Sequence, residues 1–260
     1  MLPIADPAAL LRALGPLDRC MVVLDFDGTL SPIVAHHAEA TLPPGAGAAL
    51  DRLARVARVV ISSGRDVDDL QARVGDRDVV FVGGHGARIV HRGRLMVELV
   101  DEDSMTALLD TVEHDLLPAI DGHEGWVIER KPTSIAVHHR AATDRGPLAD
   151  VRRVLQGHAD ASGDAEVLEG RAVVELRSAA SNKGRALTWL LDAFDGPKTL
   201  AIGDDVTDED MFRVARDRGG VGVLVGTPRQ TAASFVLADP AAVIDLLDGL
   251  VRADRSAEEH

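Results

Sequence analysis

Apolar and polar positions alternate in two different ways along the first hundred residues. Runs of consecutive apolar residues predict buried strands, whereas apolar positions repeated every three or four residues predict helices. The expected elements are, in chain order, a helix at 6–15, a strand ending at Asp25, a helix at 46–57, a strand at 58–63, a helix at 67–74, a strand at 79–82 and a loop at 83–86 before 87–90. This order predicts an α/β fold with a doubly wound, Rossmann-like parallel sheet.

The pattern changes after residue 100. Helices are predicted at 104–120 and 144–158, and each is followed by two short strands, at 126–130 and 134–140 and at 165–168 and 172–177. Two helix-plus-hairpin units make a smaller α+β layer, which we expect to be a separate cap, or lid, inserted into the core. The alternative is one continuous sheet. We expect the alternation to break here because a cap interrupts it.

The core pattern then resumes. The expected elements are a helix at 185–194, a strand at 199–202, a helix at 211–215, a strand at 221–225 and a closing helix at 241–251, with a frayed end over 253–260. The predicted organisation is therefore a core domain formed by residues 1–100 and 179–260, interrupted by an α+β cap domain at 101–178.

Composition narrows the classes of partner. The 260 residues include 42 acidic and 28 basic side chains, for a formal net charge of −14, and no basic run is present, which argues against nucleic acid as a partner. Cys20 is the single cysteine, so no internal disulfide forms, as in proteins of a reducing compartment, although an exported domain can look the same. No signal-peptide pattern and no apolar stretch of roughly 20 residues is present. We expect a cytoplasmic monomer that does not bind membranes.

Two acids end the apolar strand that begins at residue 22. Asp25 and Asp27 stand there, followed by Gly28, and open parallel sheets place their sites at the carboxyl ends of such strands. Two neighbouring carboxylates repel each other unless a cation lies between them or one carries a proton. An ordinary strand-to-turn junction is the structural alternative, because Asp and Gly are common in turns.

Three further stretches are predicted at the same edge of the sheet. They are Ser63–Arg65, Lys183–Gly184 and the acidic segment Asp204–Asp210. Together with Asp25 and Asp27 they supply a nucleophile, a proton donor, positive charge for phosphoryl oxygens and hard oxygen ligands for a cation. The combination predicts phosphoryl transfer.

Each of these stretches also has a purely structural reading. Acids at a helix N-terminus stabilise the helix, but five acids within seven residues at 204–210 favour a bound magnesium ion. Lys183 is one of only three lysines in an arginine-rich chain, which favours a phosphate contact over a surface position. For Ser63, a helix cap and a phosphate contact are equally consistent with the sequence.

The motifs resemble those of the haloacid dehalogenase superfamily of phosphatases. The matching segments are Asp-Phe-Asp-Gly-Thr-Leu at 25–30, Ser-Gly-Arg at 63–65, Asn-Lys-Gly at 182–184 and Gly-Asp-Asp-Val-Thr-Asp-Glu-Asp at 203–210. The resemblance implies that Asp25 is the nucleophile, that Asp27 is the acid and base, and that Ser63 and Lys183 hold phosphoryl oxygens. It also implies Mg²⁺ as cofactor, bound by Asp25, the Asp27 carbonyl and Asp204, with Asp205 or Asp208 acting through water.

Within the superfamily, the chain resembles trehalose-6-phosphate phosphatases. The closer match rests on segments 83–86, 129–131, 137–140 and 174–177. It implies hydrolysis of trehalose 6-phosphate to trehalose and phosphate, the last step of trehalose biosynthesis. The implied substrate-binding residues are Gly84, His85, Gly86, Glu129, Lys131, His138, Arg140 and Glu175.

The sequence departs from the pattern of these phosphatases at three positions. Gly84 stands where serine is usual, His139 where an aromatic residue is usual and Arg171 where lysine is expected. The departures concern contacts to the sugar and leave the core motifs intact. Three alternatives therefore remain open: a phosphatase acting on sucrose 6-phosphate or mannosyl-3-phosphoglycerate, a catalytically inactive sugar-phosphate sensor, and an acidic scaffold protein.

Overall fold

The computed structural model describes residues 2–34, 39–170 and 172–258 and divides into two units. Residues 1–97 and 182–260 belong to the first unit, and residues 98–181 belong to the second. Arg171 lies outside the described residues. The role of the second unit as a lid stays a prediction.

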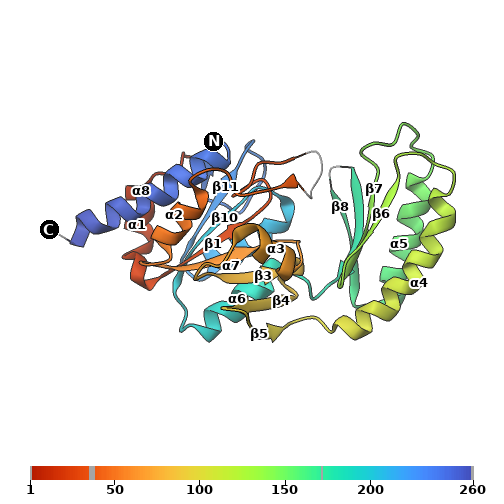
Figure 1. Ribbon diagram of the computed structural model, residues 1–260, viewed down its shortest axis with the longest axis horizontal. Coiled ribbons are helices and arrows are strands. Elements are labelled where there is room, and N and C mark those ends of the chain that lie inside the picture. Colours follow the sequence, from red (N-terminus) through yellow and green to blue (C-terminus); the bar gives the residue numbers. More distant parts are fainter. Residues whose placement is uncertain (1, 35–38, 171, 259–260) are drawn as a thin grey trace. The chain divides into compact units, whose positions relative to one another are not determined.

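An eight-stranded sheet forms the centre of the first unit (Figure 1). Strand β1 lies between β10 and β2 and is parallel to both, and β3, β11 and β12 extend the parallel arrangement on either side. The order across the sheet is β12 (Phe235–Leu237), β11 (Val221–Val225), β10 (Lys198–Gly203), β1 (Cys20–Asp25), β2 (Arg58–Ser62), β3 (Val80–Gly83), β4 (Arg88–His91) and β5 (Arg94–Glu98). The carboxyl ends of six parallel strands therefore meet at one edge.

The predicted α/β fold with a parallel-sheet core is confirmed, and an antiparallel hairpin extends one side of the sheet. Strand β4 runs antiparallel to β3, and β5 follows it after Arg92 and Gly93. Both of these turn residues have positive φ, +50° and +68°, the conformation that a tight two-residue hairpin turn requires. A hairpin thus completes the edge where the sequence analysis placed only residues 87–90.

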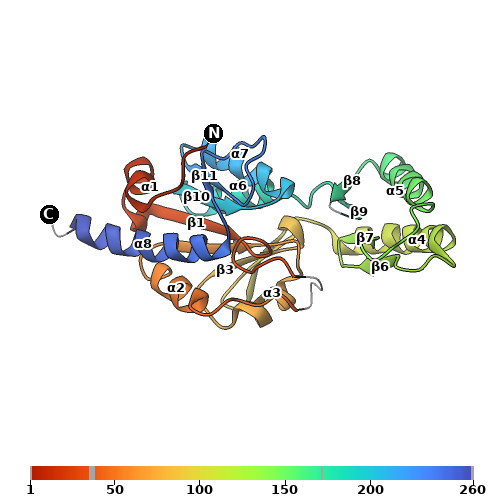
Figure 2. The same cartoon turned by 90° about the horizontal axis from the view of Figure 1, so that it is seen from above.

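Helices cover both faces of this sheet. Helices α1 (Pro7–Leu14), α2 (Ala46–Leu53), α3 (Val67–Val74) and α8 (Pro240–Glu258) share one apolar cluster with Val221 and Val223 of β11. A side chain at Gly222, which faces the opposite way, would meet Phe212 of α7 (Glu209–Asp217). Helix α7 therefore lies on the other face, where it packs with α6 (Lys183–Ala193), as Figure 2 shows.

Helix α8 extends beyond the predicted end. We expected fraying from residue 253, but the helix continues to Glu258. The reason is a long-range contact: the buried Asp254 carboxylate accepts a hydrogen bond of 3.0 Å from the main-chain nitrogen of Leu17. The frayed-end prediction is therefore wrong for residues 253–258, and residues 259–260 lie outside the described part.

The second unit is a four-stranded antiparallel sheet with two helices. Its strand order is β6 (Val127–Arg130), β7 (Ser134–His138), β9 (Val173–Ser178) and β8 (Ala165–Gly170), and its helices are α4 (Glu102–Ile120) and α5 (Leu148–Ser162). Ile135 and Val137 of β7 pair with Leu176 and Val174 of β9 on one face of the sheet. The intervening residues, including Ala136, occupy the other face because side chains alternate along a strand. The helices pack against the sheet.

Helix α5 begins four residues after its predicted start. The main-chain carbonyl of Asp144 accepts a hydrogen bond from the Trp126 indole, and the Asp144 carboxylate accepts one from the nitrogen of Gly146. These contacts hold residues 144–146 as a turn before the helix. Among the described residues, no helix combines the length and the apolar character that crossing a bilayer requires.

Candidate functional site

Lys183 joins two acids at the carboxyl edge of the core sheet. Its Nζ lies 2.6 Å from Oδ1 of Asp25, at the end of β1, and 2.6 Å from Oδ1 of Asp208. Asn182 precedes it as the N-cap of α6 and accepts hydrogen bonds from the nitrogens of Gly184 and Arg185. The Asn182 side chain fixes where α6 begins, and Lys183 occupies the first helical position. All three charged side chains are buried.

Asp204 brings a third carboxylate to the same place. Oxygen atoms of Asp25, Asp204 and Asp208 lie within 4.8 Å of one another. Gly28, with φ of +84°, allows this approach, because a Cβ there would lie 2.2 Å from Oδ2 of Asp204. The Asp-x-Asp-Gly turn after β1 and the acidic turn after β10 therefore fit together only with glycine at position 28.

The cluster shifts the pKa values of its members. Burial raises the pKa of Asp25 well above its ordinary value against the opposing effect of Lys183, and the charges of Asp208 and Asp204 raise it further. Burial and the neighbouring Asp208 and Asp205 raise the pKa of Asp204 to about 7. Burial alone lowers the pKa of Lys183, but the carboxylates of Asp208 and Asp25 outweigh it and raise that pKa. Lys183 is therefore charged. Its single positive charge does not neutralise the three carboxylates around it.

The residues present fit a divalent cation. Oδ1 of Asp204 is buried and accepts no hydrogen bond within the described part of the chain. An all-oxygen set of carboxylates is the donor set that Mg²⁺ prefers. Asp205 does not join this group: it is exposed, and its carboxylate caps the turn by accepting from the nitrogen of Val206. The structure thus brings Asp208, rather than Asp205, into the cluster.

Asp27 points to a different neighbour. Both of its carboxylate oxygens accept hydrogen bonds from Arg65, at 2.7 Å each, and Arg65 also donates to Asp69. The Arg65 side chain is only 8% exposed, whereas that of Asp27 is 43% exposed. Asp27 is therefore held by a buried guanidinium at the rim of the site, apart from the three-acid cluster.

Ser63 directly follows β2 at the carboxyl edge of the sheet. Ser62 is the register partner of Asp25 in the parallel pair, so Ser63 follows directly at the same edge. The N-cap of α3 is Asp66, and the Ser63 hydroxyl accepts from the nitrogen of Arg65 at 3.1 Å instead. Ser63 does not cap the helix, which leaves its phosphate contact as the remaining prediction.

The loop containing Gly84, His85 and Gly86 packs between β2 and α6. The nitrogen of His85 donates to the carbonyl of Ser63 at 2.9 Å, and that of Gly84 donates to the carbonyl of Arg65 at 2.8 Å. A Cβ at Gly86, where φ is +107°, would lie 2.5 Å from the carbonyl oxygen of Asn182. This loop therefore links the Ser63 turn to the start of α6.

Four other predicted substrate-binding residues form a cluster in the second unit. Glu129, Ala136 and Glu175 are register partners across β6, β7 and β9, which places both glutamates on the sheet face that Ala136 occupies. Lys131 Nζ lies 3.8 Å from Glu129 Oε2 and 3.7 Å from Glu175 Oε1, and His138 Nε2 lies 2.7 Å from Glu129 Oε2. Because the resemblance in the sequence predicts that these four side chains bind sugar, they are called the sugar-site cluster.

Arg140 and His139 lie outside the sugar-site cluster. Arg140 follows β7 in a bend and is exposed, and it takes no part in the ion pairs of the cluster. His139 is buried and its ring stacks on Trp126 with centroids 5.0 Å apart. Burial and the charge of Arg145 lower the pKa of His139, so a neutral ring takes the place of the expected aromatic residue.

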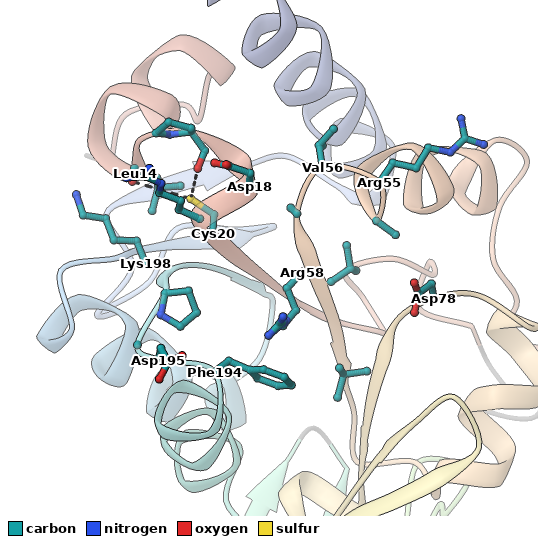
Figure 3. A pocket seen from close by; sticks show the side chains of 18 of the residues that line it. Leu14, Asp18, Cys20, Arg55, Val56, Arg58, Asp78, Phe194, Asp195 and Lys198 are labelled. Carbon is teal, nitrogen blue, oxygen red and sulfur yellow. Dashed lines mark hydrogen bonds between the residues drawn. The ribbon is translucent and has the colours of Figure 1, made fainter. Parts of the chain in front are cut away.

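A cavity of about 910 Å³ lies at the opposite edge of the core sheet (Figure 3). Its lining includes Cys20, Arg58 and Lys198, the first residues of β1, β2 and β10. The Arg58 guanidinium lies 3.6 Å from the centre of the Phe194 ring, a cation–π contact. Since the acidic cluster lies at the other ends of these strands, this cavity is separate from the candidate active site.

Sequence reasoning missed the arginines around the site. Arg65 was part of a quoted motif but had no assigned partner, and Arg229, which donates to the carbonyls of Asp204 and Asp205, was not singled out. Their partners lie 38 residues away for Arg65 and about 25 residues away for Arg229. In the sequence, the density of acids at 204–210 was the one indication that positively charged side chains lie close to them.

Comparison with known proteins identifies the family. The model of the trehalose-phosphatase family matches residues 23–241. A trehalose-phosphate phosphatase of Mycobacterium tuberculosis is 37% identical over 264 residues, an alignment that covers 95% of this chain and 66% of that protein. The chain thus spans slightly less than two thirds of the length of that relative.

Solved structures agree with this result. The C-terminal domain of trehalose-6-phosphate phosphatase from C. albicans superimposes with a TM-score of 0.83 at 26% identity, covering 97% of this chain and 98% of that one. A haloacid dehalogenase-like hydrolase from B. subtilis shares the fold, with a TM-score of 0.60 at 18% identity over 88% of this chain and 98% of that one. The resemblance noted in the sequence is confirmed, and the chain belongs to the trehalose-phosphatase family.

Proposed function

We propose that this protein is a magnesium-dependent phosphatase that hydrolyses trehalose 6-phosphate to trehalose and phosphate through an aspartyl-phosphate intermediate. The observation that carries the proposal is the contact of Lys183 with Asp25 and Asp208, next to the unpaired carboxylate oxygen of Asp204. Three acids face one ammonium there, and the site attracts a cation and the phosphoryl group it accompanies.

In the first step, a carboxylate oxygen of Asp25 attacks phosphorus. The bond between phosphorus and the sugar oxygen breaks with its electron pair, and that oxygen takes a proton from the Asp27 carboxyl group. Both Asp27 oxygens accept hydrogen bonds from Arg65, which hold the carboxyl group in one orientation. Lys183 and Ser63 stabilise the charge on the transferring oxygens.

In the second step, water attacks the aspartyl phosphate. The Asp27 carboxylate takes a proton from the water, whose oxygen bonds to phosphorus while the bond to Asp25 breaks. Inorganic phosphate leaves, and the Asp25 carboxylate and the Asp27 carboxyl group are restored. A magnesium ion would be held by Asp25, Asp204, the Asp27 carbonyl and Asp208, and it would supply neutralising charge for the phosphoryl oxygens.

The sugar-site cluster supports a sugar as the leaving group. A disaccharide presents many hydroxyls and no charge, and the paired glutamate and lysine side chains of the cluster offer both acceptors and donors. A sugar of the wrong shape leaves such groups without partners, which is a strong source of specificity. We assign the second unit the role of a cap, and Gly84, His85 and Arg140 additional contacts to substrate.

The acidic composition and the single cysteine support a cytoplasmic monomer with no nucleic-acid partner. Size-exclusion chromatography with light scattering measures the oligomeric state directly. A dimer at micromolar concentration contradicts the monomer.

Phosphate release from a panel of substrates with magnesium tests the proposed function. The panel contains trehalose 6-phosphate, sucrose 6-phosphate, mannosyl-3-phosphoglycerate and 4-nitrophenyl phosphate, which lacks a sugar. We expect trehalose 6-phosphate to be preferred over the other sugars by at least about ten-fold in kcat/KM, since a wrong sugar leaves polar groups of the cluster without partners. Lys131→Met should erase this preference and leave hydrolysis of 4-nitrophenyl phosphate unchanged.

The other outcomes separate the alternatives. Equal rates on all three sugar phosphates defeat the assignment to trehalose 6-phosphate. Binding of trehalose 6-phosphate without phosphate release identifies a sensor. No release from any compound and no thermal shift with magnesium leave only a scaffold.

A further inference from the structure

Arg229 contacts the acidic turn from a distant part of the chain. It lies in the loop between β11 and β12, and its Nη2 donates to the carbonyl oxygen of Asp205 at 2.7 Å and to that of Asp204 at 3.5 Å. Its Nη1 forms an ion pair with Glu209, the first residue of α7. One guanidinium therefore contacts both ends of the turn that contributes Asp204 and Asp208.

Glu209 anchors this contact on the other side. Its side chain is buried, and its second oxygen accepts a hydrogen bond of 2.7 Å from the nitrogen of Ala232. The loop is itself tied to the sheet, because the nitrogen of Ser234 donates to the carbonyl of Gly222 at 2.8 Å. Arg229 and Glu209 thus fasten the acidic turn to a loop that the edge of the sheet holds in place.

The acidic turn has a reason to move. Asp204 and Asp208 lie close to Asp25, with carboxylate oxygens of all three within 4.8 Å of one another, so their negative charges repel. Repulsion of this kind pushes the turn away from β1 when no cation is bound. Hydrogen bonds to two successive carbonyl groups fix the peptide planes on either side of Asp205, and with them the direction in which the Asp204 side chain leaves the main chain.

We propose that Arg229 is a positioning residue that holds the acidic turn in the geometry that binds a divalent cation. The inference rests on the proposed magnesium site and adds a residue to it that does not touch the cation. Partners that orient metal ligands from behind contribute about 10- to 100-fold to metal affinity or activity in other proteins. Arginine suits the position because its planar fork reaches the two carbonyls and the carboxylate together, whereas lysine presents a single ammonium.

The test measures cation binding without substrate. The thermal unfolding midpoint of the full chain is recorded against magnesium concentration for wild type, Arg229→Ala and Arg229→Lys. We expect the magnesium concentration giving half of the stabilisation to rise at least about ten-fold in Arg229→Ala and by a smaller factor in Arg229→Lys. The matched control is Arg213→Ala, which removes an exposed arginine that pairs with Asp210 within α7. This variant should keep the wild-type magnesium concentration for half of the stabilisation.

The outcomes distinguish the inference from the proposed function. If Arg229→Ala lowers the midpoint in the absence of magnesium but keeps the wild-type half-saturation, Arg229 has only a structural role and the inference is wrong. If Arg229→Ala does not fold, Arg229→Lys decides by the same criterion. A wild-type protein that magnesium does not stabilise overturns both the cation site and the inference, whereas magnesium binding with no phosphatase activity overturns only the proposed function.

Discussion

Each unit of the protein contains a lysine between two acids, and the two arrangements differ in burial and distance. Lys183 lies 2.6 Å from Asp25 and from Asp208, and its side chain is 2% exposed. Lys131 lies 3.8 Å from Glu129 and 3.7 Å from Glu175, and its side chain is 27% exposed. A lysine between two acids is therefore tightly packed and buried in the first unit, and more loosely packed and partly exposed in the second.

The charge balance of the two clusters differs as well. In the first unit Asp204 adds a third carboxylate to the group around Lys183, so three acids face one ammonium. In the second unit Lys131 lies between Glu129 and Glu175, and His138 Nε2 lies 2.7 Å from Glu129 Oε2. A site short of positive charge suits a cation and a phosphoryl group, whereas a site that mixes hydrogen-bond donors and acceptors suits an uncharged sugar.

Replacing each lysine by methionine should give the largest contrast between the units. Lys183→Met leaves the Asp25 and Asp208 carboxylates buried without the positive charge that pairs with them, and we expect a loss of about 3 kcal/mol or more in the free energy of unfolding. Lys131→Met affects partly hydrated glutamates at longer distances, and we expect a loss below about 1 kcal/mol. Urea unfolding without magnesium measures both values. Equal losses contradict the distinction between a buried and a hydrated cluster.

The effect of pH on magnesium binding should be smaller but specific to the first unit. The pKa of Asp204 is raised from 3.8 to about 7, so between these values the folded protein holds a proton that the unfolded chain has lost. The stability of the metal-free protein therefore falls as pH rises through this range. Magnesium competes with that proton, and the stabilisation it provides should grow from about pH 5 to about pH 8.

Thermal unfolding at several pH values, with and without magnesium, checks this expectation. Calcium at equal concentration serves as a control for a general effect of divalent charge, because magnesium prefers a smaller and more regular oxygen site. A stabilisation by magnesium that does not change with pH contradicts the assignment of the cation to the Asp204 cluster.

The sequence predicted the elements that are most apolar or most periodic. The helix at 67–74 has the predicted limits. The strand before Asp25 was recognised from its continuous run of apolar residues, and the structure buries all of its side chains. Strands β5 and β12 were not predicted, for two different reasons. The first is half exposed at the edge of the sheet, and the second has three residues, too few to show any period.

The sequence also predicted which segments meet at the carboxyl edge, because parallel strands bring their ends together whatever lies between them. Asp25, Lys183 and Asp204 accordingly lie close together. The ion pair of Asp27 with Arg65 and the contact of Arg229 with the acidic turn were not predictable, because they depend on side-chain directions set by the folded loops. The catalytic roles of these residues stay predictions.

The most direct test of the account is to trap the phosphoryl group on Asp25. Asp27→Asn removes both the acid of the first step and the base of the second, so the trap uses 4-nitrophenyl phosphate, whose nitrophenolate group leaves without a proton. The variant mixed with this compound and magnesium, then quenched in acid, should accumulate the aspartyl phosphate. Mass spectrometry of the peptide that contains Asp25 should find one phosphoryl group, and the same peptide from Asp25→Asn should carry none. If wild type releases phosphate but the trapped variant carries the phosphoryl group on another residue or on none, the account is contradicted.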